Sequence, residues 1–144
     1  MKVTGMDHTG VTVKNLEKAI EFYSGVLGFK VVEEPCDMVT DKEESKALGL
    51  PECVHRICLL EVPGESDHYV EFMEYGDAPS PNDEPLSLNQ IGQGHISLKV
   101  ENMQKSVDEL TKMGLEFLYK PLPAGDRQWV LVKDPDGIIL ELIG

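Results

Sequence analysis

A chain of 144 residues can bury about two thirds of its unfolded surface, so it can form one domain with a hydrophobic core and no disulfides. The formal net charge of −13 repels nucleic-acid phosphates and anionic lipids, and no apolar run approaches the roughly 20 residues that span a bilayer. We therefore expect neither a nucleic-acid partner nor a membrane. Three cysteines without CxxC spacing, and an N-terminus unlike a signal peptide, predict a cytoplasmic protein with free thiols.

The first half is predicted to begin with a strand that contains His8, followed by a helix. Apolar residues recur at helical spacing over residues 16–27, with Asn15 as the N-cap and Gly28 as the stop signal. A short apolar run at residues 29–32 predicts the next strand. The chain then enters a Pro-containing polar stretch.

This polar stretch, residues 35–54, is predicted to be irregular apart from one short helix. Asp41 and Glu44 have the spacing of a capping box, which predicts that the helix covers residues 41–48. Two strands joined by a hairpin turn then complete the first half, at residues 56–62 and 68–75 with the turn at 63–67.

The second half repeats this order. Residues 8–20 recur as residues 95–107, and each copy reads as strand, Asn and helix. The second helix is expected to begin after Asn102 and to end at Gly114, and apolar runs predict strands at 115–119, 128–133 and 138–143. A polar segment with three prolines predicts a linker, which divides the chain into a first module of about 1–76, a linker of about 77–90 and a second module of about 91–144.

Two histidines and two glutamates stand at equivalent places in this repeat, namely His8, Glu71, His95 and Glu141. Side chains alternate across a strand, so each of the four is expected to point away from the face that packs on a helix. A single His or Glu in a strand is usually an ordinary surface residue, but recurrence in both copies favours ligands that converge in one cleft. Imidazole and carboxylate together suit Zn, Ni, Co, Mn or Fe(II), and the sequence does not choose among them.

Other polar residues near these strands are predicted to have ordinary roles. His55 and His68 begin strands without a partner in the repeat, so we interpret both as surface residues. Glu74 is expected to point away from the face of Glu71, because the two residues are an odd number of positions apart.

The chain resembles the vicinal oxygen chelate superfamily, which contains glyoxalase I, methylmalonyl-CoA epimerase, bleomycin resistance proteins and extradiol dioxygenases. The matching stretches cover nearly the whole chain, at residues 6–13, 19–23, 27–29, 70–72, 94–100 and 134–142. The resemblance implies one domain of the α+β class, in which two βαβββ modules form an incomplete barrel around a divalent metal, commonly in a homodimer. It also implies that His8, Glu71, His95 and Glu141 occupy the four ligand positions.

By this resemblance we expect a metal-dependent lyase or isomerase that acts on a hemithioacetal or an acyl-CoA-like substrate. The metal would stabilise an enediolate while a carboxylate moves a proton, and the candidates for this base are Glu141, Glu71 and Glu52, the last near a catalytic carboxylate of the epimerases. Full retention of the ligand set argues for chemistry, because bleomycin-binding members generally lack it.

Substrate contacts are predicted on the same faces of the strands. Tyr69, Met73 and Trp129 are candidates to line the cleft, and Arg127, Lys120 and Lys99 are candidates to bind an anionic tail. The alternative is a non-catalytic protein of the bleomycin-resistance type, which would hold a small aromatic or drug-like molecule in this cleft. A metal-free cleft that still binds ligands would favour this alternative.

Overall fold

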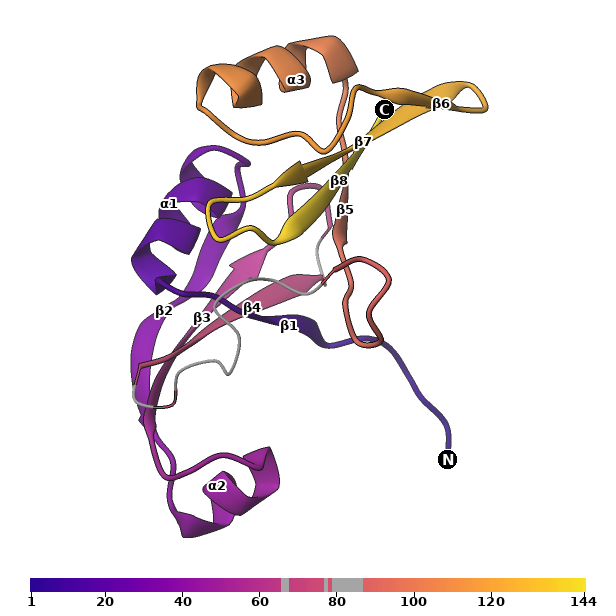
Figure 1. Cartoon of the computed structure of the whole chain (residues 1–144). Helices are drawn as coiled ribbons and strands as arrows, with labels where there is room; N and C mark the ends of the chain where they lie inside the picture. The colour runs from indigo at the N-terminus through magenta and orange to yellow at the C-terminus, as the bar shows by residue number, and fades with distance from the viewer. Residues whose placement is uncertain (66–67, 77, 79–86) are drawn as a thin grey trace. The chain divides into compact units, whose positions relative to one another are not determined.

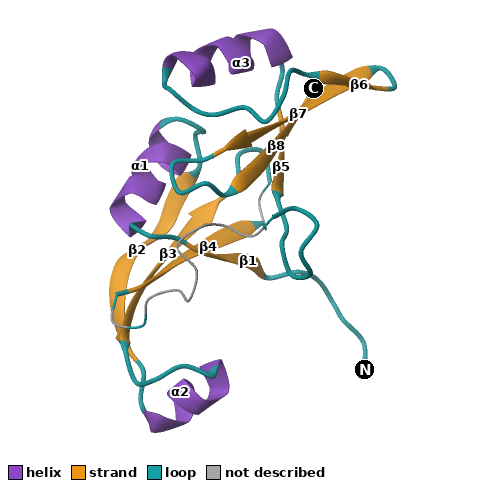
Figure 2. Ribbon diagram, in the orientation of Figure 1, coloured by secondary structure: helices purple, strands orange, loops and turns teal. Residues whose placement is uncertain are grey.

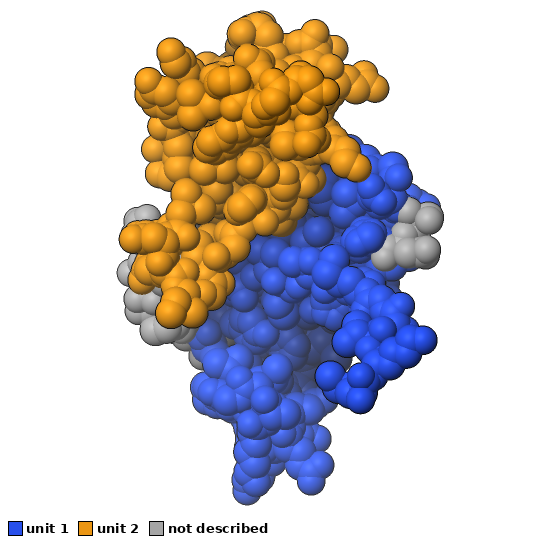
Figure 3. Space-filling view, turned by 90° about the vertical axis from the view of Figure 1, so that its right-hand side faces the viewer, with its two compact units in different colours: residues 1–81 blue, residues 82–144 orange. Residues whose placement is uncertain are grey.

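Each half of the chain forms one four-stranded sheet with a helix after its first strand (Figures 1 and 2). The computed structural model describes residues 1–65, 68–76, 78 and 87–144. These residues belong to two compact units, residues 1–81 and residues 82–144, which Figure 3 colours separately. Most of the predicted linker, and residues 66 and 67 of the predicted hairpin turn, lie outside the described residues.

The first unit contains four strands and two helices in the sheet order β1-β4-β3-β2. Strand β1 runs parallel to β4, while β3 is antiparallel to both of its neighbours. The elements are β1 (His8–Thr12), α1 (Leu16–Gly25), β2 (Lys30–Val39), α2 (Lys42–Leu48), β3 (Val54–Glu61) and β4 (Tyr69–Tyr75).

The second unit has the same topology, with the sheet order β5-β8-β7-β6 and a parallel pair between β5 and β8. Its elements are β5 (Ile96–Lys99), α3 (Met103–Lys112), β6 (Leu122–Ala124), β7 (Arg127–Lys133) and β8 (Ile139–Ile143). Both sheets are open. The predicted pair of βαβββ modules is confirmed, with α2 inserted into the first.

Helix α1 covers one face of the first sheet and lies against β2, β3 and β4. The Asn15 side chain caps it by accepting a 2.9 Å hydrogen bond from the Lys18 backbone N–H, as predicted. Tyr23 of this helix and Phe72 of β4 are fully buried, with their ring centroids 4.5 Å apart. Because Phe72 and Val70 face the helix, the alternate residues of β4, including Glu71, face the other side of the sheet.

Two predicted strand boundaries are wrong. Strand β2 continues to Val39 through residues that read as irregular, because an edge strand tolerates Pro35 and two register shifts that break regular pairing with β3. Residues 115–119 make only one isolated bridge, between Phe117 and Val132, and β6 is the strand that completes the second sheet. Both errors arise where pairing between strands overrides the local apolar pattern.

Helix α2 is joined to the first sheet by a buried polar cluster. Asp41 and Glu44 form the predicted capping box at its start. Behind it, Thr40 Oγ1 accepts a 3.1 Å hydrogen bond from Ser45 Oγ and a 2.8 Å bond from the Cys53 backbone N–H. These bonds satisfy the buried hydroxyls and fix α2 against the ends of β2 and β3.

In the described ranges, no helix has both the length and the apolar composition required to pass through a bilayer.

The three cysteines are free thiols and differ in accessibility, since Cys36 is exposed while Cys53 and Cys58 are buried. Burial, with a smaller effect of nearby negative charge, raises the pKa of the Cys58 thiol to about 11. At pH 8 a thiol with this pKa is ionised about 100-fold less than an ordinary cysteine, and the thiolate is the reactive form. We therefore expect one fast equivalent in a disulfide-exchange assay with a chromogenic reagent, and two more only in denaturant.

The Cys36→Ser variant is the matched control for this assay and should lose the fast phase entirely. Rapid reaction of all three thiols in the native protein would contradict the burial of Cys53 and Cys58.

Candidate metal centre

The first candidate pair consists of His8 on β1 and Glu71 on β4. The two strands are parallel neighbours, with Gly10 in register with Glu71. His8 Nε2 lies 3.6 Å from Glu71 Oε2, and the side chains are 40% and 23% exposed, respectively. A Cβ atom added at Gly10 would lie 4.0 Å from Glu71 Oε2, so Gly10 shares the face of the pair. Both side chains thus point away from the helix, as the alternation predicts.

Asp7 orients the His8 ring. His8 Nδ1 lies 2.8 Å from Asp7 Oδ1, and because a carboxylate only accepts, Nδ1 carries the proton. This hydrogen bond raises the pKa of His8 above its ordinary value, while burial opposes the rise and the charge of Glu71 adds to it. A carboxylate on the outer ring nitrogen is the usual support of a metal-bound histidine, since it leaves Nε2 free to bind and makes it more basic.

The second pair, His95 and Glu141, repeats this arrangement in the other unit. His95 lies directly before β5, and its Nε2 is 3.6 Å from Glu141 Oε2 on the parallel neighbour β8. Ser97 is in register with Glu141 and its hydroxyl donates a 2.5 Å hydrogen bond to Glu141 Oε2. The adjacent residues Leu140 and Leu142 are buried, so Glu141 points to the opposite face.

The two pairs differ in the neighbouring residues that hold them in place. In the first unit a carboxylate holds the histidine, and Gly10 stands at the repeat position of Ser97. In the second unit a hydroxyl holds the glutamate, and Gly94 stands at the repeat position of Asp7. A Cβ atom at Gly10 would lie 3.0 Å from the Met73 methyl group, so Met73 occupies the space beside Gly10. Glu141 is thus fixed by a neighbouring hydroxyl, whereas no hydroxyl stands at the matching position beside Glu71.

The donor chemistry of the pairs fits a divalent metal. Each pair offers one imidazole nitrogen and one carboxylate oxygen, which is the ligand mixture of catalytic zinc, nickel, manganese and non-haem iron sites. Among the residues that the structure describes, no group of three or more His, Cys, Asp or Glu side chains is arranged so that it could hold a metal ion. Each pair therefore offers two candidate ligands within its own unit.

The other predicted site residues are dispersed. Tyr69 and Met73 alternate with the buried residues of β4 and so share the face of Glu71. Glu52 is exposed in the bend before β3, beyond the end of β4 that carries Tyr75. Glu71 lies four residues back along β4, about 13 Å at the usual rise of a strand. The structure thus does not bring Glu52 to the first pair.

In the second unit, Trp129 lies half-buried on β7 opposite Ile143, and so on the face of Glu141. Arg127 is exposed at the start of β7, and Lys99 and Lys120 are exposed as well. Exposure leaves these three cations accessible to an anionic ligand.

Two polar residues outside the pairs test the orientation of strands β3 and β4. Glu74 accepts a 2.7 Å hydrogen bond from the Leu16 backbone N–H at the start of α1, so it faces the helix as predicted. His55 is not the surface residue that was predicted. Its ring is half-buried and stacks on Tyr75 with centroids 5.3 Å apart, and its Nδ1 atom is buried without a hydrogen-bond partner in the described part of the chain.

His55 lies on the same face of the sheet as Glu71. It pairs with Tyr75, and directly opposed residues of antiparallel strands share a face. Its alternation with Cys58 and Leu60, which are buried on the other face, was the available signal.

Comparison with known proteins places this arrangement in a family. Residues 5–142 match the profile of the Glyoxalase/Bleomycin resistance protein/Dioxygenase superfamily. A lactoylglutathione lyase of Schizosaccharomyces pombe is 24% identical over 99% of this chain, but the chain spans only 48% of that relative. A probable lactoylglutathione lyase of Vibrio cholerae is 27% identical, with 94% of this chain and 87% of that protein covered.

Solved structures agree on the fold. A glyoxalase family protein of Bacillus cereus superposes with a TM-score of 0.86 at 19% identity, covering 99% of this chain and 95% of that one. The glyoxalase I of Leishmania major superposes with a TM-score of 0.68 at 24% identity, with 99% and 87% covered. Together with the match over residues 5–142, the repeated βαβββ units show that the chain belongs to the Glyoxalase/Bleomycin resistance protein/Dioxygenase superfamily.

Proposed function

We propose that the protein is a divalent-metal-dependent lyase or isomerase of the glyoxalase type, which moves a proton on a small carbonyl substrate. One observation carries the proposal. Each unit sets a His beside a Glu on the free face of a parallel strand pair, with Nε2 and Oε2 3.6 Å apart in both units. Two such pairs together contain two imidazoles and two carboxylates, which is the donor set of the proposed four-ligand site, whether it is built within one chain or across a dimer. Relatives named lactoylglutathione lyase support the lyase class.

His8, Glu71, His95 and Glu141 would hold the ion, which supplies Lewis-acid stabilisation of negative charge on a substrate oxygen. The protein's own task is then to move one proton between carbon atoms. A carboxylate takes the proton from the carbon next to the carbonyl and returns it to the neighbouring carbon or to the opposite face. Hemithioacetals and acyl-CoA-like compounds both carry such a carbon.

The two glutamates have different neighbours, which suggests different roles for them. Ser97 donates a 2.5 Å hydrogen bond to Glu141, which favours a fixed ligand. Gly10 stands at the position that Ser97 has in the other unit and has no side-chain donor, which favours a Glu71 carboxylate that can turn toward the substrate. We therefore infer that Glu71 carries the proton and that Glu141 remains a ligand. Glu52 stays outside this scheme, because the strand register separates it from Glu71.

Metal-dependent proton exchange is the test of this function. The purified protein is incubated in D₂O with hemithioacetals of short 2-oxoaldehydes and, separately, with acyl-CoA thioesters, and deuterium incorporation at carbon is followed by NMR. We expect exchange or product formation that disappears on chelation and returns with a divalent metal. Tight binding of these compounds without exchange, in both the metal-loaded and the metal-free protein, would instead favour a binding protein.

Ser97 is expected to strengthen metal binding through Glu141. Replacing Ser97 by Ala removes the hydrogen bond to Glu141 Oε2, and loss of such a supporting group typically weakens metal affinity about 10- to 100-fold. Competition with a chromogenic chelator measures this change without a substrate. The Ser97→Thr variant keeps the hydroxyl and is the matched control, since its affinity should stay near that of the original protein. Equal affinity of the Ala and Thr variants would contradict this role.

We also infer a cytoplasmic homodimer. The free thiols support a reducing compartment, and the edge strands of both open sheets offer surfaces for a second copy. Mass measurement by light scattering on a sizing column should give twice the chain mass of 16.0 kDa. A monomer at micromolar concentration would contradict the dimer.

A further inference from the structure

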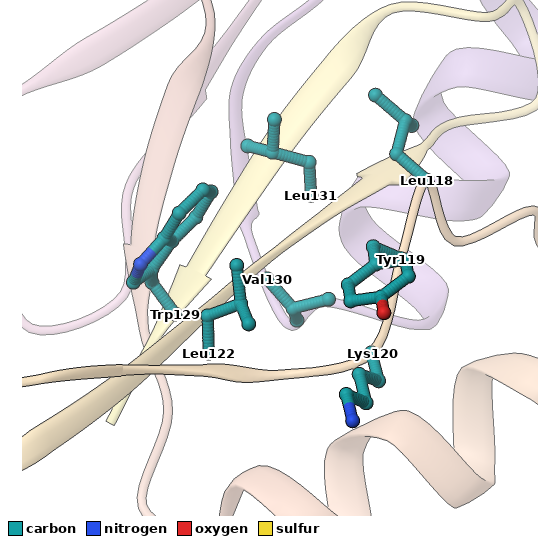
Figure 4. A pocket seen from close by; sticks show the side chains of 7 residues that line it. All are labelled: Leu118, Tyr119, Lys120, Leu122, Trp129, Val130 and Leu131. Carbon is teal, nitrogen blue, oxygen red and sulfur yellow. The ribbon is translucent and has the colours of Figure 1, made fainter.

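The second unit contains a small apolar cavity of about 70 Å³, which opens between β7 and the segment that precedes β6 (Figure 4). The leucines at 118, 122 and 131 line it together with Trp129 and Tyr119. Lys120 lies at one end, with its amino group turned away from the leucines in Figure 4 and 5.8 Å from the centroid of the Tyr119 ring. The cavity is thus mainly apolar, with the Tyr119 hydroxyl and the Lys120 ammonium as its polar groups.

This cavity adjoins the second half of the candidate metal site. Leu131 lies directly opposite Glu141 in the antiparallel pairing of β7 with β8. Directly opposed residues point to the same face with their Cβ atoms about 4.5–5.5 Å apart. Trp129 shares this face through its pairing with Leu122 and Ile143. A molecule that reaches Glu141 can therefore place a substituent over Leu131 and into the cavity.

The size of the cavity limits what it can hold. A volume of 70 Å³ is about half of the ~150 Å³ that accommodates a benzene molecule, and several times what one water needs. A branched aliphatic group of about four carbons fits these limits better than an aromatic ring, and apolar walls give it no hydrogen-bonding partner to satisfy. Lys120 supplies a local positive charge beside the cavity, in a chain whose net charge is −13.

We propose that this cavity is the specificity pocket of the protein and takes the short branched aliphatic substituent of the substrate, while Lys120 binds an anionic group on the same molecule. The substrate class is then a small aliphatic carbonyl compound with a nearby negative charge, and aryl analogues are expected to bind more weakly. This inference rests on the proposed function, because the ligand of the pocket is the substrate that reacts beside Glu141.

Trp129 gives a direct test, because it is the only tryptophan of the chain and it lines the cavity. Its fluorescence is followed in metal-free protein during titration with 3-methylbutanoate, acetate, benzoate and 3-methylbutan-1-ol. We expect a saturable change with 3-methylbutanoate, and affinities at least tenfold lower for acetate and benzoate. A fluorescence change that does not saturate, or equal affinities for 3-methylbutanoate, acetate and benzoate, would contradict the assignment of this pocket.

Two variants locate the binding. Leu118→Phe fills the cavity and should weaken 3-methylbutanoate at least tenfold, whereas Leu48→Phe, at an exposed leucine of α2, should leave it unchanged. Lys120→Gln should weaken 3-methylbutanoate but not the uncharged alcohol. Thermal unfolding checks that each variant is folded. If Leu118→Phe folds and still binds as tightly as the original protein, the pocket assignment is wrong.

These titrations use no metal and no reactive carbonyl, so they fail or succeed independently of the proposed chemistry. Saturable binding without metal-dependent proton exchange would support the pocket and contradict the proposed catalytic function. Proton exchange without binding of these probes would support the proposed catalytic function and contradict the pocket.

Discussion

Replacing Glu71 by Gln is expected to lower turnover by about 100- to 10,000-fold, the usual contribution of a positioned general base. The amide cannot accept a proton from carbon, but its oxygen can still ligate a metal, so the variant should still bind metal. We assign this role to Glu71 because its Oε2 lies 3.6 Å from His8 Nε2 and Gly10 offers it no hydroxyl. Turnover and metal content are measured on the same samples.

Glu141→Gln is the matched variant and should behave differently. Ser97 holds Glu141 as a fixed ligand, so this change is expected to reduce both metal affinity and turnover. Far-UV circular dichroism should show an unchanged fold in both variants, because neither side chain belongs to the buried core. If Glu71→Gln keeps normal turnover while Glu141→Gln keeps its metal and loses turnover, the roles of the two glutamates are reversed.

Replacing Phe72 by Ala is expected to destabilise the protein by about 3–5 kcal/mol, the range for deleting a large buried aromatic side chain. Phe72 is completely buried on the helix face of β4, and its ring packs 4.5 Å from the Tyr23 ring, centroid to centroid. The destabilisation has two parts. The variant loses the free energy gained by burying the ring, and a cavity is left under α1. Urea unfolding followed by circular dichroism measures the change.

The control for this experiment is Tyr119→Ala, since Tyr119 is 64% exposed and its removal should change stability by less than about 0.5 kcal/mol. A Phe72→Ala variant within 1 kcal/mol of the original protein would show that α1 does not pack on β4 as described.

Local patterns in the sequence predicted most elements of the fold. Asn15 and Asp41 were identified as helix caps because an N-cap depends only on a few neighbouring residues. The faces of β4 and β8 followed from simple alternation, which placed Glu71 and Glu141 opposite the buried residues. The internal repeat predicted that His8 and His95 occupy equivalent positions, because this equivalence does not depend on the strand pairing.

The supports of the site were not predictable in the same way. The bond from Ser97 to Glu141 depends on a parallel pairing between residues 44 positions apart, and no local pattern encodes that register. His55 was misplaced because a histidine at the start of a strand looks exposed until its pairing with Tyr75 is known. The predicted strand at residues 29–32 ended too early for a related reason. Pro35 normally ends a strand, and β2 tolerates it because β2 lies at the edge of the sheet.

The most direct test of the account is elemental analysis of the purified protein beside a His8→Ala, His95→Ala double variant. The proposed four-ligand site predicts close to one divalent metal per chain in the original protein, removable by chelation and restored by reloading, and none in the variant. A chain that contains no metal even after reloading, or a double variant that keeps it, would contradict a metal site built from the two His–Glu pairs.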